Sequence, residues 1–488
     1  MLFNSISFIF LFFPIVTLSY FLLPYRYRHF FVLFASCWFY MAFAPIYILI
    51  LAFLIVVDFW AGLVIEPAIG ERRKVLLVLS LLANIGTLAI FKYFNFVNAN
   101  LADLAHIIGW NYSISGLSLI LPLGLSFHTF QSMSYTIDVY RKRQKAERDI
   151  WIYALYVMYY PQLVAGPIER PRNMLPQFQI EHHFDYDRFL SGMRLVLMGF
   201  FKKLVIANRL SGFVDIVYGK PEDSTELSLL LATYFFAFQI YCDFSGYTDI
   251  ARGISRIMGI ELMNNFDHPY CSRSVSEFWG RWHISLSSWF KEYLYVPLGG
   301  NRVAAWRWAL NIMIVFLISG LWHGASWTFV VWGGLHGFYS LFGRFSEPFR
   351  SWFVHSIRLD RLPRIYAGIK ILITFHIVTL AWIFFRTDTI QRGFYIIAHL
   401  FTGWHVSADY VMSSIFPFTR NVTSISHLLI AIILLSTLES AQWLQRNRSS
   451  RWALLILDRF SASTWAACLL IILFFGNYGS YTFIYFQF

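Results

Sequence analysis

The 488-residue sequence is poor in charge and in cysteine, and each shortage excludes a class of protein. Asp, Glu, Lys and Arg make up 14% of the residues, whereas soluble globular proteins average about 25%. The four cysteines are scattered and form no C-x-x-C pair, which argues against a disulfide framework and against a structural zinc site. The sequence also has no nucleic-acid-binding motif, no internal repeat and no low-complexity linker.

Apolar residues fill the chain instead and make up 58% of it. Because a helix of about 20 mostly apolar residues spans a bilayer, the recurring apolar runs predict roughly 10 to 13 transmembrane or re-entrant helices. The expected fold class is an all-α polytopic membrane protein, and a single membrane domain over residues 1–488 is the simplest organisation. The run at residues 6–23 lacks a basic leader and a small-residue cleavage site, so we interpret it as a retained first span.

The charges of the loops predict a topology. The net charge is +12, and positive-inside topology is a better explanation for it than attraction of an anionic substrate or lipid headgroup. Basic residues at 26–29, 141–148 and 446–459 indicate cytoplasmic loops, which leaves the N-terminus outside. One more span, at about residues 464–475, then places the aromatic tail 477–488 on the extracytoplasmic side.

Acidic and basic side chains follow a long apolar run at residues 241–252. Asp243, Asp249 and Arg252 stand where lipid would otherwise be expected, and such residues face a bundle interior or a water-filled cavity. Asp249 and Arg252 are spaced i, i+3, so they can pair on a helix. The three residues are candidates for a substrate path, and a buried pair that locks helices together is the structural alternative.

The stretch at residues 277–301 is amphipathic and rich in aromatic residues. Helical spacing places Trp282, Trp289 and Tyr293 near one face, which predicts a helix that lies at the membrane surface or dips partly into it. Simple anchoring is one interpretation, and handling the headgroup of a soluble donor is the other. Arg281 and His283 are the candidate substrate residues of this stretch.

Two histidines lie in the apolar region that begins with Leu321-Trp322-His323-Gly324 and ends with His336-Gly337. On one straight helix their offset of 13 residues would give about 20 Å of rise and roughly 220° of rotation, so a shared metal ion is disfavoured. We expect either a helix break near Gly333-Gly334 or action at different depths. A lone histidine suits general-base chemistry, and a packing histidine is the alternative. Trp322 is a candidate substrate or tunnel residue.

The chain ends with Tyr481-Thr482-Phe483-Ile484-Tyr485-Phe486-Gln487-Phe488. An aromatic tail at a membrane interface usually serves as an anchor. The hydroxyl of Tyr485, however, would be a possible covalent acyl carrier if it lay beside a base.

Together these segments resemble the membrane-bound O-acyltransferase family, in the bacterial branch that includes the alginate O-acetylation membrane protein. The resemblance implies helices around a central funnel or tunnel. It also implies that His323 is the essential catalytic residue and that His336 has a less defined role. The motifs cover most of the chain and are specific in combination: residues 91–96, 121–138, 161–169, 241–252, 277–302 and Trp322-His323-Gly324.

The resemblance further implies a multi-pass protein of the bacterial inner membrane, with acetyl-CoA as acyl donor and no bound cofactor or metal. The acyl group would pass from the cytoplasmic thioester to Tyr485, then to an extracytoplasmic partner of the SGNH hydrolase-like fold. That partner would acetylate a polysaccharide such as alginate, cellulose or peptidoglycan. Two other classes stay open from the residues themselves: a transporter or flippase for an acyl donor, and a structural subunit that docks the extracytoplasmic enzyme.

Overall fold

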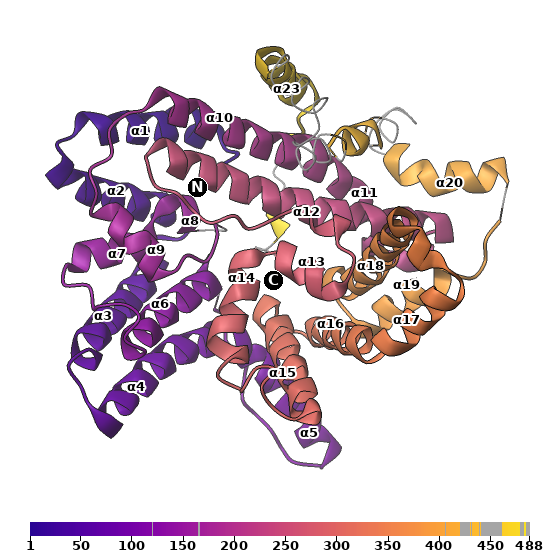
Figure 1. Cartoon of the computed structure of the whole chain (residues 1–488), viewed down its shortest axis with the longest axis horizontal. Coiled ribbons are helices and arrows are strands. Elements are labelled where there is room, and N and C mark those ends of the chain that lie inside the picture. The colour runs from indigo at the N-terminus through magenta and orange to yellow at the C-terminus, as the bar shows by residue number, and fades with distance from the viewer. Residues whose placement is uncertain are drawn as a thin grey trace. The chain divides into compact units, whose positions relative to one another are not determined.

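The computed structural model describes residues 1–119, 121–163, 166–405, 407–419, 430, 432–438, 440, 461–478 and 483–484. Helices account for the regular structure over these ranges, and no strand occurs within them (Figure 1). The predicted all-α class is therefore confirmed.

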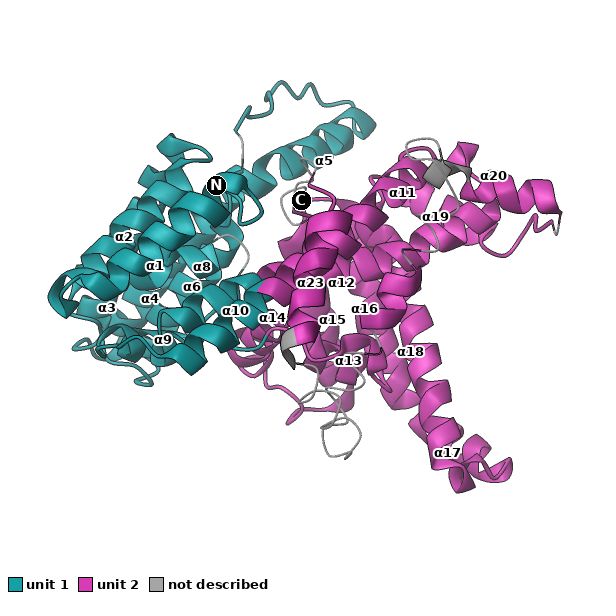
Figure 2. Ribbon diagram, turned by 90° about the horizontal axis from the view of Figure 1, so that it is seen from above, with its two compact units in different colours: residues 1–196, 248–264 teal, residues 197–247, 265–488 magenta. Residues whose placement is uncertain are grey.

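The chain divides into two compact units, which Figure 2 colours teal and magenta. Unit 1 contains Met1–Val196 and Thr248–Asn264, and unit 2 contains Leu197–Tyr247 and Asn265–Phe488. Two of the three boundaries fall inside α10 (Tyr186–Phe200) and α12 (Glu226–Ile257), and the third follows Asn264, after the end of α12. The single domain expected over residues 1–488 stays a prediction.

Unit 1 begins with a run of helices joined by short connections. A buried polar cluster joins two of them: Asp58 on α3 accepts hydrogen bonds from Ser80 (2.7 Å) and Asn84 (2.9 Å) on α4. The elements are η1 (Phe8–Phe12), α1 (Phe13–Leu22), α2 (Tyr25–Met41), η2 (Pro45–Tyr47), α3 (Ile48–Ile65), α4 (Gly70–Leu88), η3 (Ala89–Tyr93), α5 (Phe94–Ile107), α6 (Leu125–Tyr140), α7 (Ile150–Met158), α8 (Tyr160–Leu163) and α9 (Pro171–Phe178).

Unit 2 holds a large buried core in which aromatic side chains from several helices meet. Besides its parts of α10 and α12, its elements are η4 (Phe201–Ala207), α11 (Asn208–Gly219), η5 (Pro221–Asp223), η6 (Pro269–Cys271), α13 (Val275–Arg281), α14 (Ile284–Phe290), η7 (Lys291–Tyr295), α15 (Ala305–His323), α16 (Trp327–Phe345), α17 (Glu347–Ser356), η8 (Leu359–Arg361), α18 (Pro363–Arg386), α19 (Ile390–His399), α20 (Ala408–Thr419) and α23 (Ser461–Phe475).

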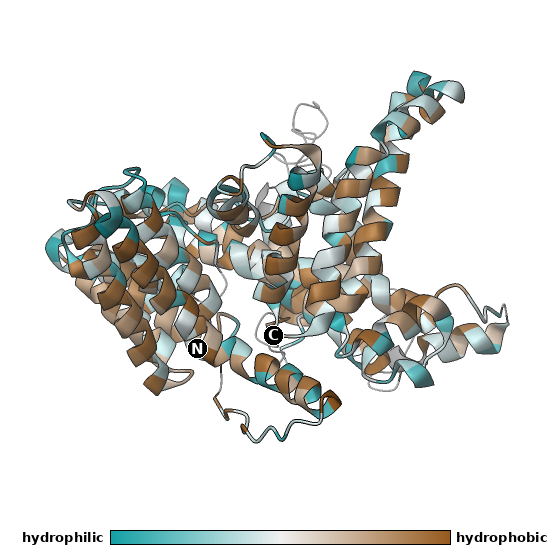
Figure 3. Cartoon of the chain, turned by 90° about the horizontal axis from the view of Figure 1, so that it is seen from below, coloured by the Kyte–Doolittle hydropathy of each residue, from teal (hydrophilic) through white to brown (hydrophobic). Residues whose placement is uncertain are grey.

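Five helical stretches of the described chain are long and apolar enough to cross a membrane, and two shorter ones are also apolar. This is fewer than the 10 to 13 segments expected, because several apolar runs fold into short helices such as α7 and α8. Figure 3 shows hydrophobic residues along the helices and hydrophilic residues gathered near their ends. The five are Pro45–Ile65, Gly70–Ile107, Glu226–Ile257, Ala305–His323 and Pro363–Arg386, and the shorter two are Phe8–Leu22 and Ser463–Phe475.

The aromatic stretch at residues 277–301 does not form the single surface helix that its spacing predicts. The backbone of His283 takes a left-handed conformation (φ +44°) between α13 and α14, and a residue other than glycine rarely continues a helix from there. Trp282, Trp289 and Tyr293 are all buried against other protein side chains. The segment is therefore two short helices with a π-helical turn, and these three rings pack inside the protein.

Candidate active site

His323 is the last residue of α15, and the chain reverses directly after it. Gly324 is extended, and a Cβ at this position would lie 2.1 Å from the Phe329 ring, so only glycine fits the turn. Ser326 then caps α16 by accepting a hydrogen bond from the backbone N–H of Thr328. The turn therefore fixes where α15 ends and holds His323 at the end of the helix.

α15 and α16 pack against each other at two glycines. A Cβ on Gly320 would lie 2.2 Å from the carbonyl oxygen of Phe329, and one on Gly333 would lie 2.3 Å from that of Phe316. Small residues allow backbones to approach this closely in membrane proteins. The close approach brings α16 side chains against His323.

Trp332 lies between the two histidines of the site. Its ring centroid is 5.0 Å from that of His323 and 5.0 Å from that of His336, with an edge-type contact in each case. Trp322 and Phe385 add further edge contacts to His323, at 4.9 Å and 5.3 Å. Both histidines are buried, so the site is an imidazole pair in an aromatic enclosure.

His336 has a defined hydrogen-bond orientation. The indole Nε1–H of Trp279, on α13, donates to Nδ1 of His336 over 3.3 Å. A ring that accepts at Nδ1 carries its own proton at Nε2 when neutral. Within the described part of the chain Nε2 has no hydrogen-bond partner, so this N–H is a buried donor that a substrate oxygen can use.

The helix break between the histidines is real but lies elsewhere than expected. The sequence predicted it near Gly333-Gly334, whereas the chain turns at residues 324–326 and both glycines lie inside α16. The rise and rotation of one straight helix therefore do not apply to His323 and His336. Among the described residues no group of three or more His, Cys, Asp or Glu side chains is arranged to hold a metal ion.

His283 is fully buried beside the same aromatic cluster. Its ring contacts Phe244 at 4.7 Å and Trp322 at 6.2 Å, and its Nδ1 lies 3.2 Å from Oδ1 of Asn265. Burial lowers the pKa of His283 to about 3, which makes the imidazole a weak proton acceptor. Its surroundings are those of a structural residue next to the site.

Asp243 lies on the unit 2 part of α12 and has two partners. Oδ1 pairs with Lys203 Nζ at 2.5 Å, and Oδ2 accepts the backbone N–H of Ile484 over 2.9 Å. The ring of Phe483 packs against Phe244 (5.8 Å). The expected acyl carrier, Tyr485, lies outside the described residues, but the two residues before it are anchored in unit 2.

The other predicted polar residues are placed as follows. Asp249 and Arg252, which belong to unit 1, form the predicted i, i+3 ion pair at 3.6 Å, and Arg252 also donates to Asn264 over 3.2 Å. Arg281 pairs with Glu277 on α13 at 2.8 Å. The first pairing is confirmed, whereas the roles of these residues toward a substrate stay predictions.

Sequence reasoning missed three residues that shape the site. Trp279 and Trp332 orient and separate the histidines, and Lys203 neutralises Asp243. The pair Lys202-Lys203 inside an apolar run was a usable signal, because a lysine in such a run is costly and usually paired. No comparable signal separates Trp279 and Trp332 from the other 16 tryptophans of the chain.

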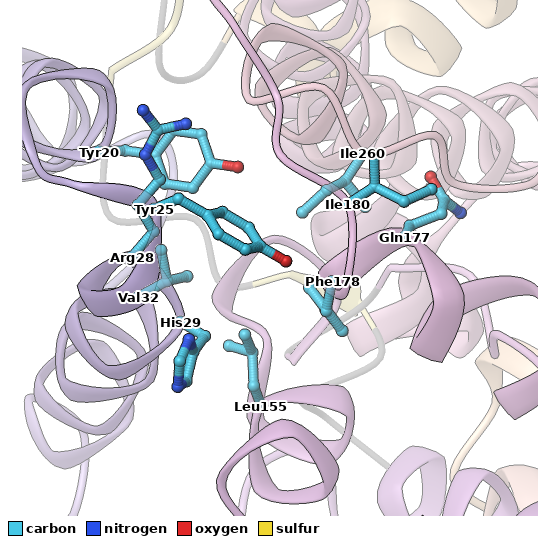
Figure 4. Close-up of a pocket in the computed structure, with 10 residues that line it drawn as sticks. All are labelled: Tyr20, Tyr25, Arg28, His29, Val32, Leu155, Gln177, Phe178, Ile180 and Ile260. Atoms are coloured by element: carbon cyan, nitrogen blue, oxygen red, sulfur yellow. The ribbon is translucent and has the colours of Figure 1, made fainter. Parts of the chain in front are cut away.

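Unit 1 has a hollow of its own, shown in Figure 4. Among the residues that line it, Arg28 is the one Arg, Lys, Asp or Glu. Its guanidinium donates hydrogen bonds to the backbone oxygens of Leu23 (2.9 Å) and His182 (2.6 Å). No residue predicted for the site lines this hollow. It is lined by Tyr20, Tyr25, Arg28, His29, Val32, Leu155, Gln177, Phe178, Ile180 and Ile260.

Comparison with known proteins identifies the family of the chain. The sequence profile of MBOAT, the membrane-bound O-acyltransferase family, matches residues 149–385. A probable alginate O-acetylase AlgI of Pseudomonas aeruginosa is 35% identical over 83% of this chain and 76% of its own length. A peptidoglycan O-acetyltransferase of Helicobacter pylori is 35% identical over 80% of this chain and 78% of its own.

A teichoic acid D-alanyltransferase of Bacillus subtilis is more distant, at 27% identity over 55% of this chain and 69% of its own. Residues 149–385, which the family profile matches, include His323, His336, α12, α13 and α14. The chain belongs to the membrane-bound O-acyltransferase family, and it is an O-acyltransferase.

Proposed function

We propose that the protein transfers an acetyl group from cytoplasmic acetyl-CoA to the hydroxyl of Tyr485, for delivery to an extracytoplasmic polysaccharide. One observation carries the proposal. Ring contacts run from His323 through Trp322 (4.9 Å), His283 (6.2 Å) and Phe244 (4.7 Å) to Phe483 (5.8 Å), two residues before Tyr485. The tail and the catalytic histidine therefore belong to one cluster of unit 2.

The chemistry assigns a role to each histidine. His323 takes the proton of the Tyr485 hydroxyl, and the phenolate oxygen attacks the thioester carbonyl carbon. The C–S bond breaks, and the CoA thiolate takes the proton from the His323 imidazolium, which leaves an acetyl-tyrosine ester and free CoA. Three aromatic rings with centroids within 5.3 Å of the His323 ring enclose the imidazole at which this proton transfer takes place. Nε2–H of His336 donates to the thioester oxygen, on which negative charge develops.

The acceptor is an envelope polysaccharide, which the relatives named for alginate and peptidoglycan O-acetylation support. A hydrolase-fold partner on the outer face of the bacterial inner membrane takes the acetyl group from Tyr485 onto its own serine. The tyrosine recovers its proton in this step and is ready for the next cycle. The partner then sets which polymer hydroxyl is acetylated.

Labelled acetyl-CoA tests the proposal on the full-length protein. The wild type should carry a hydroxylamine-labile acetyl group on its C-terminal peptide, and His323→Ala and Tyr485→Phe should both lack it at unchanged protein level. Tyr478→Phe, at an exposed tail tyrosine whose hydroxyl donates to the Ile472 carbonyl, is the matched control and should keep the label. Full polymer acetylation by Tyr485→Phe would eliminate the relay.

The same experiment separates the other classes of protein. A transporter would move label across the membrane with no covalent acetyl-protein. A structural subunit would show neither movement nor label, and its loss would act only through the partner. Transfer that depends on His323 is expected from the enzyme alone.

A further inference from the structure

Lys203 and Asp243 form a buried ion pair. The stability that this pair contributes to the fold does not explain its presence. Both side chains are at most 5% exposed, and Asp243 lies on α12, which is long and apolar enough to span a membrane. A buried ion pair is seldom more stabilising than apolar residues of the same volume. In a membrane segment such residues usually serve a function.

Lys203 and Asp243 meet where η4 and α12 pack closely against each other. A Cβ on Gly246 would lie 2.8 Å from the carbonyl oxygen of Gly199 and 3.2 Å from the backbone nitrogen of Lys203. The π-helical segment η4, which carries Lys203, therefore lies directly against α12. π-helical turns are rare and are frequent at functional sites.

The C-terminal tail is held at two points by this same region. At its start, the N–H of Asn477 donates to the carbonyl oxygen of Leu204 over 2.9 Å, and Asn208 Nδ2 donates to the carbonyl of Asn477 over 2.8 Å. Both holding residues lie in η4 or at the start of α11. The beginning of the tail is thus bonded to the segment that supplies Lys203.

At the second point, Ile484 of the tail bonds to Asp243. Oδ2 accepts the N–H of Ile484 while Oδ1 is committed to Lys203, and the Phe483 ring packs on Tyr247 at 4.8 Å. A hydrogen bond from a backbone N–H to an ionised carboxylate is stronger than one to a neutral acceptor. The contact of Lys203 with Oδ1 therefore fixes the orientation of the carboxylate and directs its second oxygen to Ile484.

We propose that Lys203 and Asp243 are a positioning pair that fixes the tail at Ile484 and so presents the next residue, Tyr485, to the acyl donor. The inference rests on the proposed function, because the pair affects catalysis only if Tyr485 carries the acetyl group. Neither side chain is placed at the reacting atoms. Loss of the pair lowers kcat and leaves the KM for the donor unchanged.

Hydrogen exchange of the C-terminal peptide, measured on the full-length protein in lipid nanodiscs, reads the Ile484 N–H directly. Asp243→Ala should speed exchange about 10-fold or more, since a charge-assisted hydrogen bond is lost. Asp243→Asn keeps an acceptor and should give an intermediate rate. Unchanged exchange in both variants overturns the inference, and if the alanine variant does not fold, the asparagine variant decides.

A charge swap separates positioning from a merely structural ion pair. Lys203→Asp combined with Asp243→Lys restores opposite charges but leaves no acceptor opposite Ile484. We expect the swap to recover thermal stability while exchange stays fast and kcat stays low. Recovery of slow exchange together with full kcat would mean that only the ion pair matters, and would refute the positioning role.

Two controls keep this test independent of the relay. Asp215→Asn breaks another ion pair of unit 2, with Arg386 at 2.6 Å, and should leave tail exchange and kcat unchanged. Tyr485→Phe should leave exchange of the Ile484 amide slow, since the phenol has no part in this bond. If Tyr485→Phe keeps full activity while Asp243→Ala still loosens the tail, the relay is wrong and the anchoring is right.

Discussion

Replacing Gly333 by alanine should separate α15 and α16, the two helices that carry His323 and His336. The added Cβ would lie 2.3 Å from the carbonyl oxygen of Phe316, whereas ordinary van der Waals contact begins at 3.4 Å. A backbone oxygen cannot swing aside as a side chain can. α15 and α16 must therefore move apart by about 1 Å at this contact.

Two free-energy effects of the substitution oppose each other. Overpacking of this kind costs about 1–3 kcal/mol, and exchanging glycine for alanine in a helix recovers about 1 kcal/mol. The net expectation is a loss of about 0–2 kcal/mol in the free energy of unfolding. Activity should suffer more, because Gly320 opposes Gly333 only three residues before His323, and a 1 Å misplacement can cost about 100-fold in turnover.

Gly334→Ala is a matched control one position further along α16. The nearest atom to its added Cβ is Leu317 Cδ2 at 3.8 Å, so it changes helix propensity equally without a clash. Thermal unfolding in detergent and steady-state acetyl transfer should both distinguish the variants, with Gly334→Ala at or above the wild-type stability. Equal stability and equal turnover of the two variants would refute the close-packing argument.

Three further perturbations have defined outcomes. Trp279→Phe removes the indole donor to His336 and should lower kcat about 10-fold; an unchanged kcat in steady-state assays would count against a role for this bond. Burial lowers the pKa of His283 to about 3, so the unfolded chain binds the proton first. Stability should be full above pH 6.5 and about 2 kcal/mol lower at pH 5, and thermal melts of His283→Asn should lose much of that acid sensitivity. Asp58→Ala removes the buried carboxylate that accepts hydrogen bonds from Ser80 and Asn84 and should cost about 2 kcal/mol or more; equal melting of Asp58→Ala and wild type would exclude this.

Features that depend on local helix geometry could be predicted from the sequence. The Asp249–Arg252 pair forms because an i, i+3 spacing places two side chains on one helix face whatever surrounds them. The last span expected at residues 464–475 matches α23, Ser461–Phe475. An apolar stretch of that length needs no tertiary partner to be recognised.

Features set by turns and by distant contacts could not be predicted. Helical spacing placed His323 and His336 on opposite faces, and only the reversal after Gly324 brings both rings to Trp332. The left-handed backbone of His283 similarly divides what periodicity describes as one helix. Lys203 and Asp243 are 40 residues apart, so no pattern within one helix relates them.

The π-helical segment η4 has a consequence for how the length of this chain can vary. A π-helix bonds each residue to the fifth along, where an α-helix uses the fourth, so η4 contains surplus residues. Deleting one residue between 201 and 207 would let the backbone close into an ordinary α-helix with its hydrogen bonds kept. It would also change the angular positions of the side chains inside the segment, because an α-helix advances about 100° per residue and the wider π-helix advances less. Lys203 and Asn208 could then no longer face Asp243 and Asn477 together. Insertions and deletions in η4 should therefore disturb the contacts with Asp243 and with Asn477 together.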